Sequence, residues 1–428
     1  MNTPSRAFPK FFWILIIIVL VLFGMLFSKA YSISSKVFVS KTSFIKKVSN
    51  ILFHGGSTTL IGEDQDRINL LLLGYGGEGH DGPYLTDTII VASIKPSTKE
   101  VLLTSIPRDL LWKTGQQKIN FAYVSGLEKS QDPNQAGQKA EQAIESITGL
   151  QIPYFATVDF SGFEKAVDRI GGLDVNVEKT FTDSQFPDSG IGYLPPITFT
   201  QGLEHMNGVR ALEFARSRHG NNGEDSDFAR SKRQSLIIQS FKQKAGDLNL
   251  FTDTTKINDL TNILADHAHT NLDPDALLAL TKIVNDKNAK IISQSLDPDT
   301  LLICPDTQGS LGYTLTNCPG VSDSDIQNLF INGFDQSAVR QEKATIILEN
   351  AGTADTLYTS IKKDLTGSGV TVYEVPYKGL PLKNSVLYQI NAKPATINYL
   401  EGKLSIKAQQ KPAQMTANSD LVLIIGGQ

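Results

Sequence analysis

Cysteine is almost absent from this chain of 428 residues, which contains only Cys304 and Cys318. No histidine or second cysteine pair stands near them at the spacing of metal ligands, so they give no indication of a zinc site. Two cysteines that bracket one short loop are more typical of a disulfide in an oxidising compartment. Two free thiols are the alternative.

A strong excess of charge is also missing. The chain has 40 lysines and arginines against 44 acidic residues, a net charge of −4. This balance argues against a general nucleic-acid binder, so no nucleic-acid partner is predicted and any anion site has to be local. The length is sufficient for two or three domains with a sizeable core.

One long apolar stretch, residues 11–27 (FFWILIIIVLVLFGMLF), carries no charge. It is long enough to span hydrocarbon, and no small-residue cleavage site follows it. We therefore expect a cytoplasmic N-terminus (1–10), an uncleaved transmembrane helix (11–28) and a stalk (29–65). More lysines follow this span than precede it, which favours the opposite orientation. The cysteine pair favours a body outside the cytoplasm, and a single-pass cell-membrane protein with an extracytoplasmic C-terminal body is the interpretation adopted.

Strands alternate with helices over residues 66–333. The apolar run at 68–74 (INLLLLG) predicts a buried central strand, and further strands are expected at 88–94 and 100–106. The alternation predicts an α/β fold, a layered α/β/α domain with a central mixed sheet. A linker at 334–342 and a small α+β domain at 343–428 are expected to follow.

The most unusual stretch is residues 214–234 (FARSRHGNNGEDSDFARSKRQ). Five basic residues surround a Gly/Asn turn, after which Asp227 is expected to cap a helix. Forked guanidinium groups bind phosphate well, and a helix N-terminus attracts anions. The alternative is a salt-bridged surface turn, in which the acids of the stretch neutralise its arginines.

Two further loops, 74–88 and 105–109, each follow a predicted strand. Ligands of open α/β sheets gather at the carboxyl ends of strands, so we expect all three loops to converge. Arginine forks would hold a diphosphate there, and a carboxylate would be left for a divalent cation or as a base. Taken singly, Asp87 could be a turn cap, and Arg108 and Asp109 could simply pair with each other. The converging set is Asp87, Arg108, Asp109, Arg216, Arg218, Asp227, Arg230, Arg233 and Gln234.

Several motifs together resemble the LytR-CpsA-Psr (LCP) family. They are LTDTI (85–89), SIPRD (105–109), KINFAY (118–123), GGLDVNV (171–177), ALEFARSR (211–218) and SDFARSKRQ (226–234). The resemblance is strong over 66–244 and looser up to 333. Residues 344–375 are similar to the LytR C-terminal domain that often accompanies this family.

The resemblance implies a membrane-anchored phosphotransferase that moves a glycopolymer from a polyprenyl-pyrophosphate carrier to peptidoglycan, assisted by Mg²⁺ (or Mn²⁺). Its implied partners are that lipid-linked glycopolymer, peptidoglycan and the membrane. Asp87 would bind the cation or activate the acceptor hydroxyl, and would be catalytic together with Arg108, Arg216 and Arg218. The pyrophosphate ligands would be Arg108, Arg216, Arg218, Arg230, Arg233 and Gln234. Asp109, Asp227 and Gln234 would support or orient the arginines.

The sequence departs from the family pattern at two positions. Gly76 stands where the family usually has an acid, and Leu85 stands where it usually has an arginine. Glu78, Asp81 or Asp109 is then the candidate replacement for the missing carboxylate. These departures keep two alternatives open: a non-catalytic, membrane-tethered binder of polyprenyl-phosphate lipid or cell-wall polymer, and a lipid pyrophosphatase.

Overall fold

The structure is a computed structural model that describes residues 59–427 except 81, 188–191, 226, 248–261, 264, 285–289, 301, 414 and 416. The expected anchor (11–28) and most of the expected stalk lie outside this range. Within it, no helix combines the length and the apolar character needed to cross a membrane. The chain divides into an N-terminal unit, Met1–Ser295 with Asp306–Leu315, and a C-terminal unit, Leu296–Pro305 with Thr316–Gln428.

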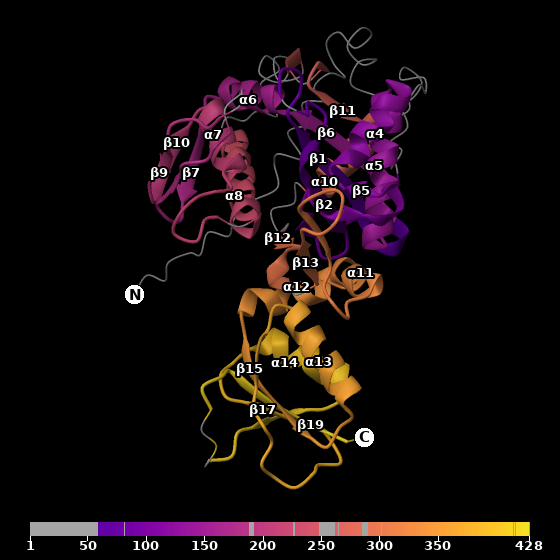
Figure 1. Ribbon diagram of the computed structural model, residues 1–428, viewed down its shortest axis with the longest axis vertical. Coiled ribbons are helices and arrows are strands. Elements are labelled where there is room, and N and C mark those ends of the chain that lie inside the picture. Colours follow the sequence, from indigo (N-terminus) through magenta and orange to yellow (C-terminus); the bar gives the residue numbers. More distant parts are fainter. Residues whose placement is uncertain are drawn as a thin grey trace. The chain divides into compact units, whose positions relative to one another are not determined.

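A six-stranded mixed sheet forms the centre of the N-terminal unit, with the strand order β11-β6-β1-β2-β3-β12 (Figure 1). β1 pairs antiparallel with β2 and parallel with β6, and β3 pairs parallel with β12. The nearly continuous apolar sequence of β1 reflects a strand that is covered on both faces. The strands are β1 (Ile68–Tyr75), β2 (Thr86–Lys95), β3 (Glu100–Ser105), β6 (Tyr154–Asp159), β11 (Ala268–Thr270) and β12 (Lys290–Ser295).

Helices cover both faces of this sheet. Neighbouring side chains of a strand point to opposite faces, and Tyr154 of β6 shares a core cluster with Leu277 of α10 (Pro274–Val284). Phe155 faces the other way, where a Cβ on Gly137 of α5 (Pro133–Thr148) would lie 2.2 Å from its ring. α4 (Phe121–Ser130) packs along α5, as Figure 1 shows. The layered α/β arrangement with a central mixed sheet is therefore confirmed.

A second core of the N-terminal unit lies between two small sheets and three helices. Its aromatic residues are Phe181, Phe199, Phe214 and Phe241. The first three rings contact one another, with centroids 5.0–6.1 Å apart; Phe181 and Phe199 are stacked, and Phe199 and Phe214 meet edge to face. The strands are β7 (Leu173–Val177), β8 (Phe181–Asp183), β9 (Ile197–Phe199) and β10 (Gly202–Met206). The helices are α6 (Phe160–Arg169), α7 (Gly208–Arg216) and α8 (Asp227–Asp247).

Residues 180–201 show no strand pattern in the sequence, and yet β8 and β9 pair there. The pairing places Phe181 directly opposite Phe199, and both side chains are almost completely buried. Burial of two aromatic rings stabilises this short ladder, although neither strand is long enough to show an alternating pattern. The hairpin matters for function because Asp183 is its last residue before the turn.

Strand direction brings the loops of interest to one edge of the central sheet. β1 ends at Tyr75, opposite the start of β2 at Thr86, and β3 ends at Ser105, opposite Ile90. The loops 74–88 and 105–109 therefore leave the sheet on the same side. Two short strands, β4 (Leu111–Trp112) and β5 (Gln117–Lys118), follow the second loop.

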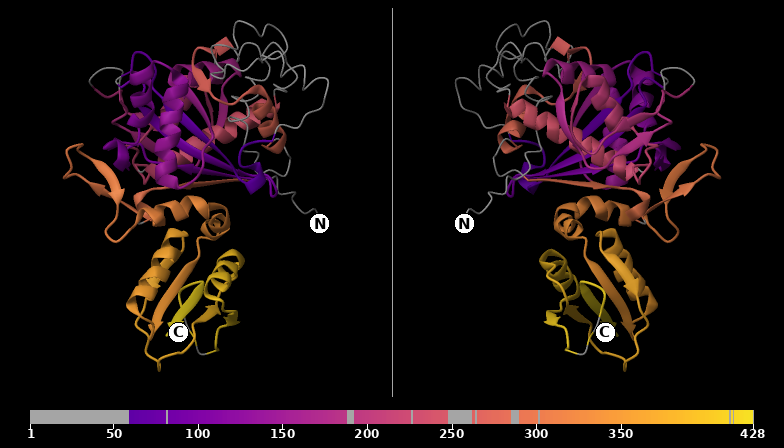
Figure 2. Two further views of the ribbon diagram at one scale, coloured as in Figure 1. Left: turned by 90° about the vertical axis from the view of Figure 1, so that its right-hand side faces the viewer. Right: turned by 90° about the vertical axis from the view of Figure 1, so that its left-hand side faces the viewer.

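The C-terminal unit contains a five-stranded sheet with the order β16-β15-β19-β17-β18. Helices α13 (Asp355–Gly367) and α14 (Pro394–Leu404) bury Ile361, Leu365 and Leu400 in a core with β15, β17 and β19; Figure 2 shows this unit in orange and yellow. The strands are β15 (Thr345–Ala351), β16 (Thr371–Glu374), β17 (Val386–Gln389), β18 (Ala408–Gln410) and β19 (Leu421–Gly426).

The expected linker at 334–342 is instead a helix, α12 (Gly333–Glu342), which follows α11 (Asp323–Ile331). Val339 of α12 belongs to the core of the C-terminal unit, so burial stabilises a segment that looked like polar linker. The division between the units accordingly falls near residues 295 and 316 rather than at 333.

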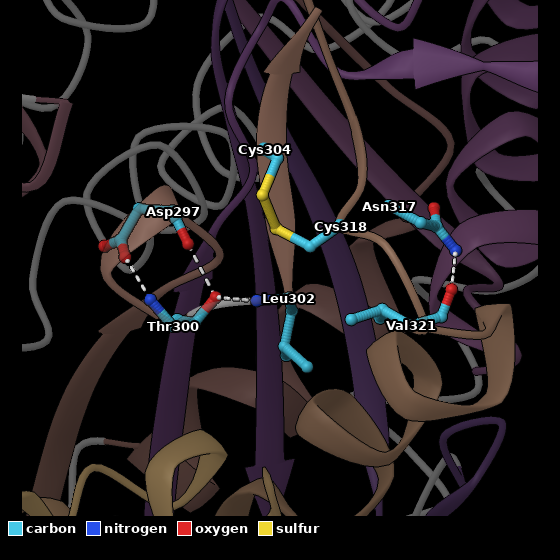
Figure 3. The surroundings of a disulfide bond; sticks show 7 residues. All are labelled: Asp297, Thr300, Leu302, Cys304, Asn317, Cys318 and Val321. Atoms are coloured by element: carbon cyan, nitrogen blue, oxygen red, sulfur yellow. Dashed lines mark hydrogen bonds between the residues drawn. A yellow bond between two sulfur atoms is a disulfide. The ribbon is translucent and has the colours of Figure 1, made fainter.

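Cys304 and Cys318, for which the sequence favoured a disulfide, are joined by one (Figure 3), with their Cα atoms 4.9 Å apart. It closes the loop that contains β13 (Ile303–Asp306) and β14 (Thr314–Asn317). The backbone N–H of Cys318 donates to the Leu302 carbonyl at 3.1 Å. Both cysteines belong to the C-terminal unit.

Candidate functional site

A cavity of about 170 Å³ lies in the N-terminal unit, where the loops after β1 and β3 meet the segment between α7 and α8. Six of the nine predicted site residues line it: Asp87, Arg108, Arg216, Arg218, Arg230 and Gln234. The other lining residues are Thr88, Asp183, Gln185, Pro187, Tyr193 and His219. The three loops therefore converge as expected, with four arginines and two carboxylates around one space.

Asp87 and Arg108 form an ion pair across this cavity. Asp87 is the second residue of β2, and Arg108 follows Pro107, the residue at which the sheet pairing of β3 has ended. About a third of the Arg108 side chain and a quarter of the Asp87 side chain are exposed, so both remain accessible to a ligand. Arg108 pairs less closely with Asp109, with 3.6 Å between its Nε and the carboxylate.

Asp109 lies behind the cavity and connects its arginines. Its carboxylate accepts a hydrogen bond from Lys118 at 2.8 Å and lies 3.7 Å from Arg218. Burial by itself would raise the pKa of Asp109, but the hydrogen bond from Lys118 and the positive charge of Arg108 hold it below its usual value. The Asp109 carbonyl accepts from the Leu315 N–H at 2.9 Å. This geometry suits a supporting role, which stays a prediction.

Arg216 is the last residue of α7, and its guanidinium group contacts two aromatic rings. It lies 4.3 Å from the centre of the Phe160 ring and 5.4 Å from that of Phe186. Burial lowers the pKa of Arg216, the charge of Asp87 opposes this, and Arg108 adds to it. The two ring contacts restrict the guanidinium group, which also lines the cavity and can bind an anion there.

Arg230 and Gln234 are four residues apart on α8 and so share one face of that helix. Arg230 is buried, and Gln234 donates from Nε2 to the Thr88 hydroxyl at 3.1 Å. This hydrogen bond connects α8 to β2 next to Asp87. Asp227 begins α8, but its side chain lies outside the described part of the structure, so its expected orienting role stays a prediction.

Arg233 is the exception among the predicted pyrophosphate ligands, because it does not line the cavity. Its side chain is only 2 % exposed and forms an ion pair with Glu224. Nε donates to the Phe214 carbonyl at 3.2 Å, and Nη2 donates to the Ser217 carbonyl. This buried arginine at the head of α8 finds an anion and acceptors within the protein and holds the turn, so its predicted role as a pyrophosphate ligand gains no support from the lining of the cavity.

Asp183 was not predicted, yet it organises the same turn from the other side. Its carboxylate is buried and accepts from the Ser217 hydroxyl, from the Arg218 N–H at 3.1 Å and from the His219 N–H at 3.2 Å. Burial alone would raise the pKa of Asp183, but these hydrogen bonds, with one from the Gln185 N–H, keep it below its usual value. Asp183 lies in a short segment without a periodic pattern or a motif, so the sequence contained no signal that could have identified it.

The residues present fit a divalent cation only with help from a substrate. In the described ranges no three His, Cys, Asp or Glu side chains are arranged to hold a metal. A Cβ on Gly76 would lie 2.8 Å from the Cβ of His80, so His80 fills the space that the missing acid would enter. Mg²⁺ commonly binds through one or two carboxylates plus substrate phosphates, and Asp87 supplies the one accessible carboxylate here.

Leu85, the second departure from the family pattern, lines a separate apolar cavity of about 470 Å³. Aromatic and aliphatic side chains of α4 form its other side, including Phe121, Val124 and Leu127. Leu85 and Asp87 are two residues apart in the chain, so this apolar cavity and the arginine-lined cavity open close to each other along the start of β2.

An α/β domain whose strand ends and neighbouring helix collect four arginines around one cavity defines an anion-binding protein suited to phosphate groups. The chain belongs to the LytR_cpsA_psr family, whose model matches residues 27–312.

Curated relatives have names that describe an activity. The chain is 33 % identical over 224 residues to the polyisoprenyl-teichoic acid–peptidoglycan teichoic acid transferase TagU of Oceanobacillus iheyensis, covering 51 % of this chain and 63 % of that protein. It is 28 % identical over 224 residues to the corresponding transferase TagV of Bacillus subtilis, covering 51 % of this chain and 52 % of that protein. The chain thus spans less than two thirds of the length of either relative.

Solved structures of this kind also match. The structure of B. subtilis TagV has a TM-score of 0.45 and 23 % identity, with 63 % of this chain and 98 % of that chain covered. B. subtilis TagU gives a TM-score of 0.43 at 22 % identity, covering 63 % and 96 %.

Proposed function

We propose that the protein is a phosphotransferase that moves a glycopolymer from a polyprenyl-pyrophosphate carrier to peptidoglycan. The observation that carries the proposal is one cavity shared by residues from the start of β2, the loop after β3, the end of α7 and the first turn of α8: Asp87, Arg108, Arg216, Arg218 and Arg230. Membership of the family and the names of the transferase relatives support it. Arginine-rich sites lower the barrier of phosphoryl transfer chiefly by positioning the phosphates and stabilising their charge.

The proposed reaction is a single substitution at phosphorus. A hydroxyl of the peptidoglycan acceptor attacks the phosphorus atom that carries the glycopolymer, a new P–O bond forms, and the P–O–P bond breaks to release polyprenyl phosphate. Asp87 would accept the hydroxyl proton or hold Mg²⁺ (or Mn²⁺) together with phosphate oxygens. The bound cation would supply additional charge neutralisation on the pyrophosphate. Arg108, which pairs with Asp87, would then turn to the pyrophosphate.

The apolar cavity beside Leu85 is the proposed site of the prenyl tail next to the pyrophosphate. The proposal also retains the membrane anchor at residues 11–28 and an extracytoplasmic body. The Cys304–Cys318 disulfide supports that location, since such bonds persist in oxidising compartments. A topology reporter fused after Gln428 that is active only in the cytoplasm would contradict it.

The experiment is transfer of a labelled glycan from a polyprenyl-pyrophosphate donor to a peptidoglycan acceptor by purified protein, with and without Mg²⁺. Arg108→Ala is expected to reduce kcat/KM by about 10²–10³-fold, as for loss of a group that stabilises transition-state charge. Asp87→Ala is expected to have at least as large an effect. A matched control is Arg210→Ala, because Arg210 pairs with Glu204 and Glu213 outside the cavity. Full activity of the Asp87 and Arg108 variants contradicts the assigned roles.

The space occupied by His80 beside Gly76 favours one alternative, a binder of the same lipid without turnover. Tight binding of the donor with no Mg²⁺-dependent product would support that alternative. Release of polyprenyl phosphate without any acceptor would identify a lipid pyrophosphatase.

A further inference from the structure

The rim of the arginine-lined cavity differs chemically from its interior. The charged lining residues are all partly or fully buried, and these are the two carboxylates and the four arginines. Four of the lining residues are exposed, and none of them is Asp, Glu, Lys or Arg. They are Gln185, Pro187, Tyr193 and His219. The cavity therefore pairs a cationic interior with an aromatic and amide rim.

The carboxylate that positions the backbone of Arg218 also positions the residues of the rim. Asp183 accepts from the Gln185 N–H at 2.9 Å and from the His219 N–H at 3.2 Å, so one carboxylate fixes both segments of the rim. Between them, Pro187 and Tyr193 form an isolated β-bridge. The position of the rim relative to the arginines is thus set by backbone hydrogen bonds and not by surface side chains alone.

Phe186 also connects the rim to the interior of the arginine-lined cavity. It is 5 % exposed, its carbonyl accepts from the Leu194 N–H at 2.9 Å, and its ring lies 5.4 Å from the guanidinium carbon of Arg216. A ligand that binds the arginines will therefore reach the rim in a defined geometry.

Tyr193 is 64 % exposed, although it belongs to a bridged segment and borders a cavity. Tyrosine has an apolar ring face and a polar tip, which suits a ligand that is apolar on one face and rich in hydroxyls at its edge. Gln185 and His219 add hydrogen-bonding groups without fixed cationic charge. A sugar ring has this combination. A prenyl chain does not, and the apolar cavity beside Leu85 is better suited to it.

We propose that Gln185, Pro187, Tyr193 and His219 form the subsite for the sugar residue attached to the pyrophosphate, with the sugar ring stacked on Tyr193. This proposal rests on the proposed function, because a pyrophosphate held by the arginines places its glycan at the rim. It adds the contact by which the protein distinguishes a glycan-bearing lipid from a bare prenyl pyrophosphate.

The test uses the full chain and two probes, a ten-carbon prenyl pyrophosphate and the same lipid carrying one N-acetylhexosamine. Tyr193→Ala is expected to weaken binding of the sugar-bearing lipid about tenfold, the size of one aromatic stacking contact. Binding of the bare lipid should stay within twofold, and Tyr193→Phe should retain affinity for both. Tyr373→Ala is the matched control, because Tyr373 is 51 % exposed in the C-terminal unit and does not line the cavity.

Three outcomes would overturn the subsite. In the first, Tyr193→Ala weakens both probes equally, which means that Tyr193 maintains the arginine cavity. In the second, it changes neither, which places the sugar elsewhere. In the third, the unmodified protein binds neither probe, and the proposed function fails together with the subsite. Only a selective loss of the sugar-bearing lipid supports it.

Discussion

Arg216 and Arg218 reach the same cavity because the backbone between them is held on both sides. Asp183 accepts from the N–H groups of residues 218 and 219, and Arg233 donates to the carbonyls of residues 214 and 217. The two buried, opposite charges thus bind the two ends of the peptide group between residues 217 and 218. Neither residue has to touch a ligand to determine where the two arginines point.

The substitution Asp183→Asn tests whether the charge of this carboxylate holds the backbone of residues 218 and 219. The buried carboxylate accepts several hydrogen bonds, and a neutral amide accepts them more weakly, so a loss of about 2–3 kcal/mol in unfolding free energy is expected at pH 7. Because the folded-state pKa lies below the usual 3.8, the carboxylate stabilises the protein above about pH 4, and this contribution disappears as the pH falls through the folded pKa.

Denaturant unfolding of both proteins between pH 7 and pH 2.5 measures the effect. The difference between them should be largest near neutral pH and shrink toward the lowest pH. A difference that is constant with pH would show that the charge of Asp183 is not what matters. Ser217→Ala, which removes one donor and leaves the charge, is expected to lose less.

At the scale of elements, one face of α8 contributes to both the site and the core. Arg230 and Gln234 line the cavity near the start of the helix, and Ile237 and Phe241, which follow at helical spacing, are buried in the core, as is Arg233. The helical period in the sequence identified the buried face correctly. It could not show whether an inward guanidinium group meets a ligand or the protein's own carbonyls, since both satisfy the same need for acceptors.

Arg233→Met distinguishes these two roles. Removing the cation leaves the Glu224 carboxylate and three backbone carbonyls without their donor, so unfolding free energy should fall by about 3 kcal/mol or more. The neighbouring Lys232, which is half exposed and pairs with Glu178, provides the control, and Lys232→Met should change stability by less than about 0.5 kcal/mol. Thermal or denaturant unfolding is the measurement. Normal stability with a large loss of pyrophosphate affinity would restore the original interpretation of Arg233.

Strand order explains why the convergence of loops was predictable. The apolar run of β1 and the alternation of strands and helices were enough to place loops 74–88 and 105–109 at one edge of a sheet. The β8–β9 hairpin and α12 were missed because each is short and its pattern is polar apart from one or two buried residues. In both cases a long-range contact, Phe181 with Phe199 or Val339 with the C-terminal core, stabilises the element.

At the scale of the molecule, the chain forms two compact units, and the disulfide belongs to the second. The sequence predicted the change of domain at 333, whereas the division between the units falls near residues 295 and 316. Buried Val339 shows that α12, which was predicted as a linker, is a packed helix.

Replacing both Cys304 and Cys318 with serine should lower unfolding free energy by about 3 kcal/mol, the usual effect of opening a loop of this length. The measurement is denaturant unfolding of the oxidised protein and of the double variant. Reductant should bring the unmodified protein to the stability of the variant and leave the variant unchanged. Equal stability of the two oxidised proteins would show that hydrogen bonds such as that from the Cys318 N–H hold the loop without the bond.

Binding of an anion in the cavity should also change the free energy of unfolding. Its arginines come from positions 108, 216, 218 and 230, so folding brings together like charges that repel one another less in the unfolded chain. Asp87 and Asp183 offset only part of that charge. A polyanion that binds the folded form alone adds about 2.7 kcal/mol of stability at a hundred times its dissociation constant. The unliganded protein therefore contains electrostatic repulsion that a bound polyanion relieves, and the folded state should be most resistant to unfolding when the cavity is occupied.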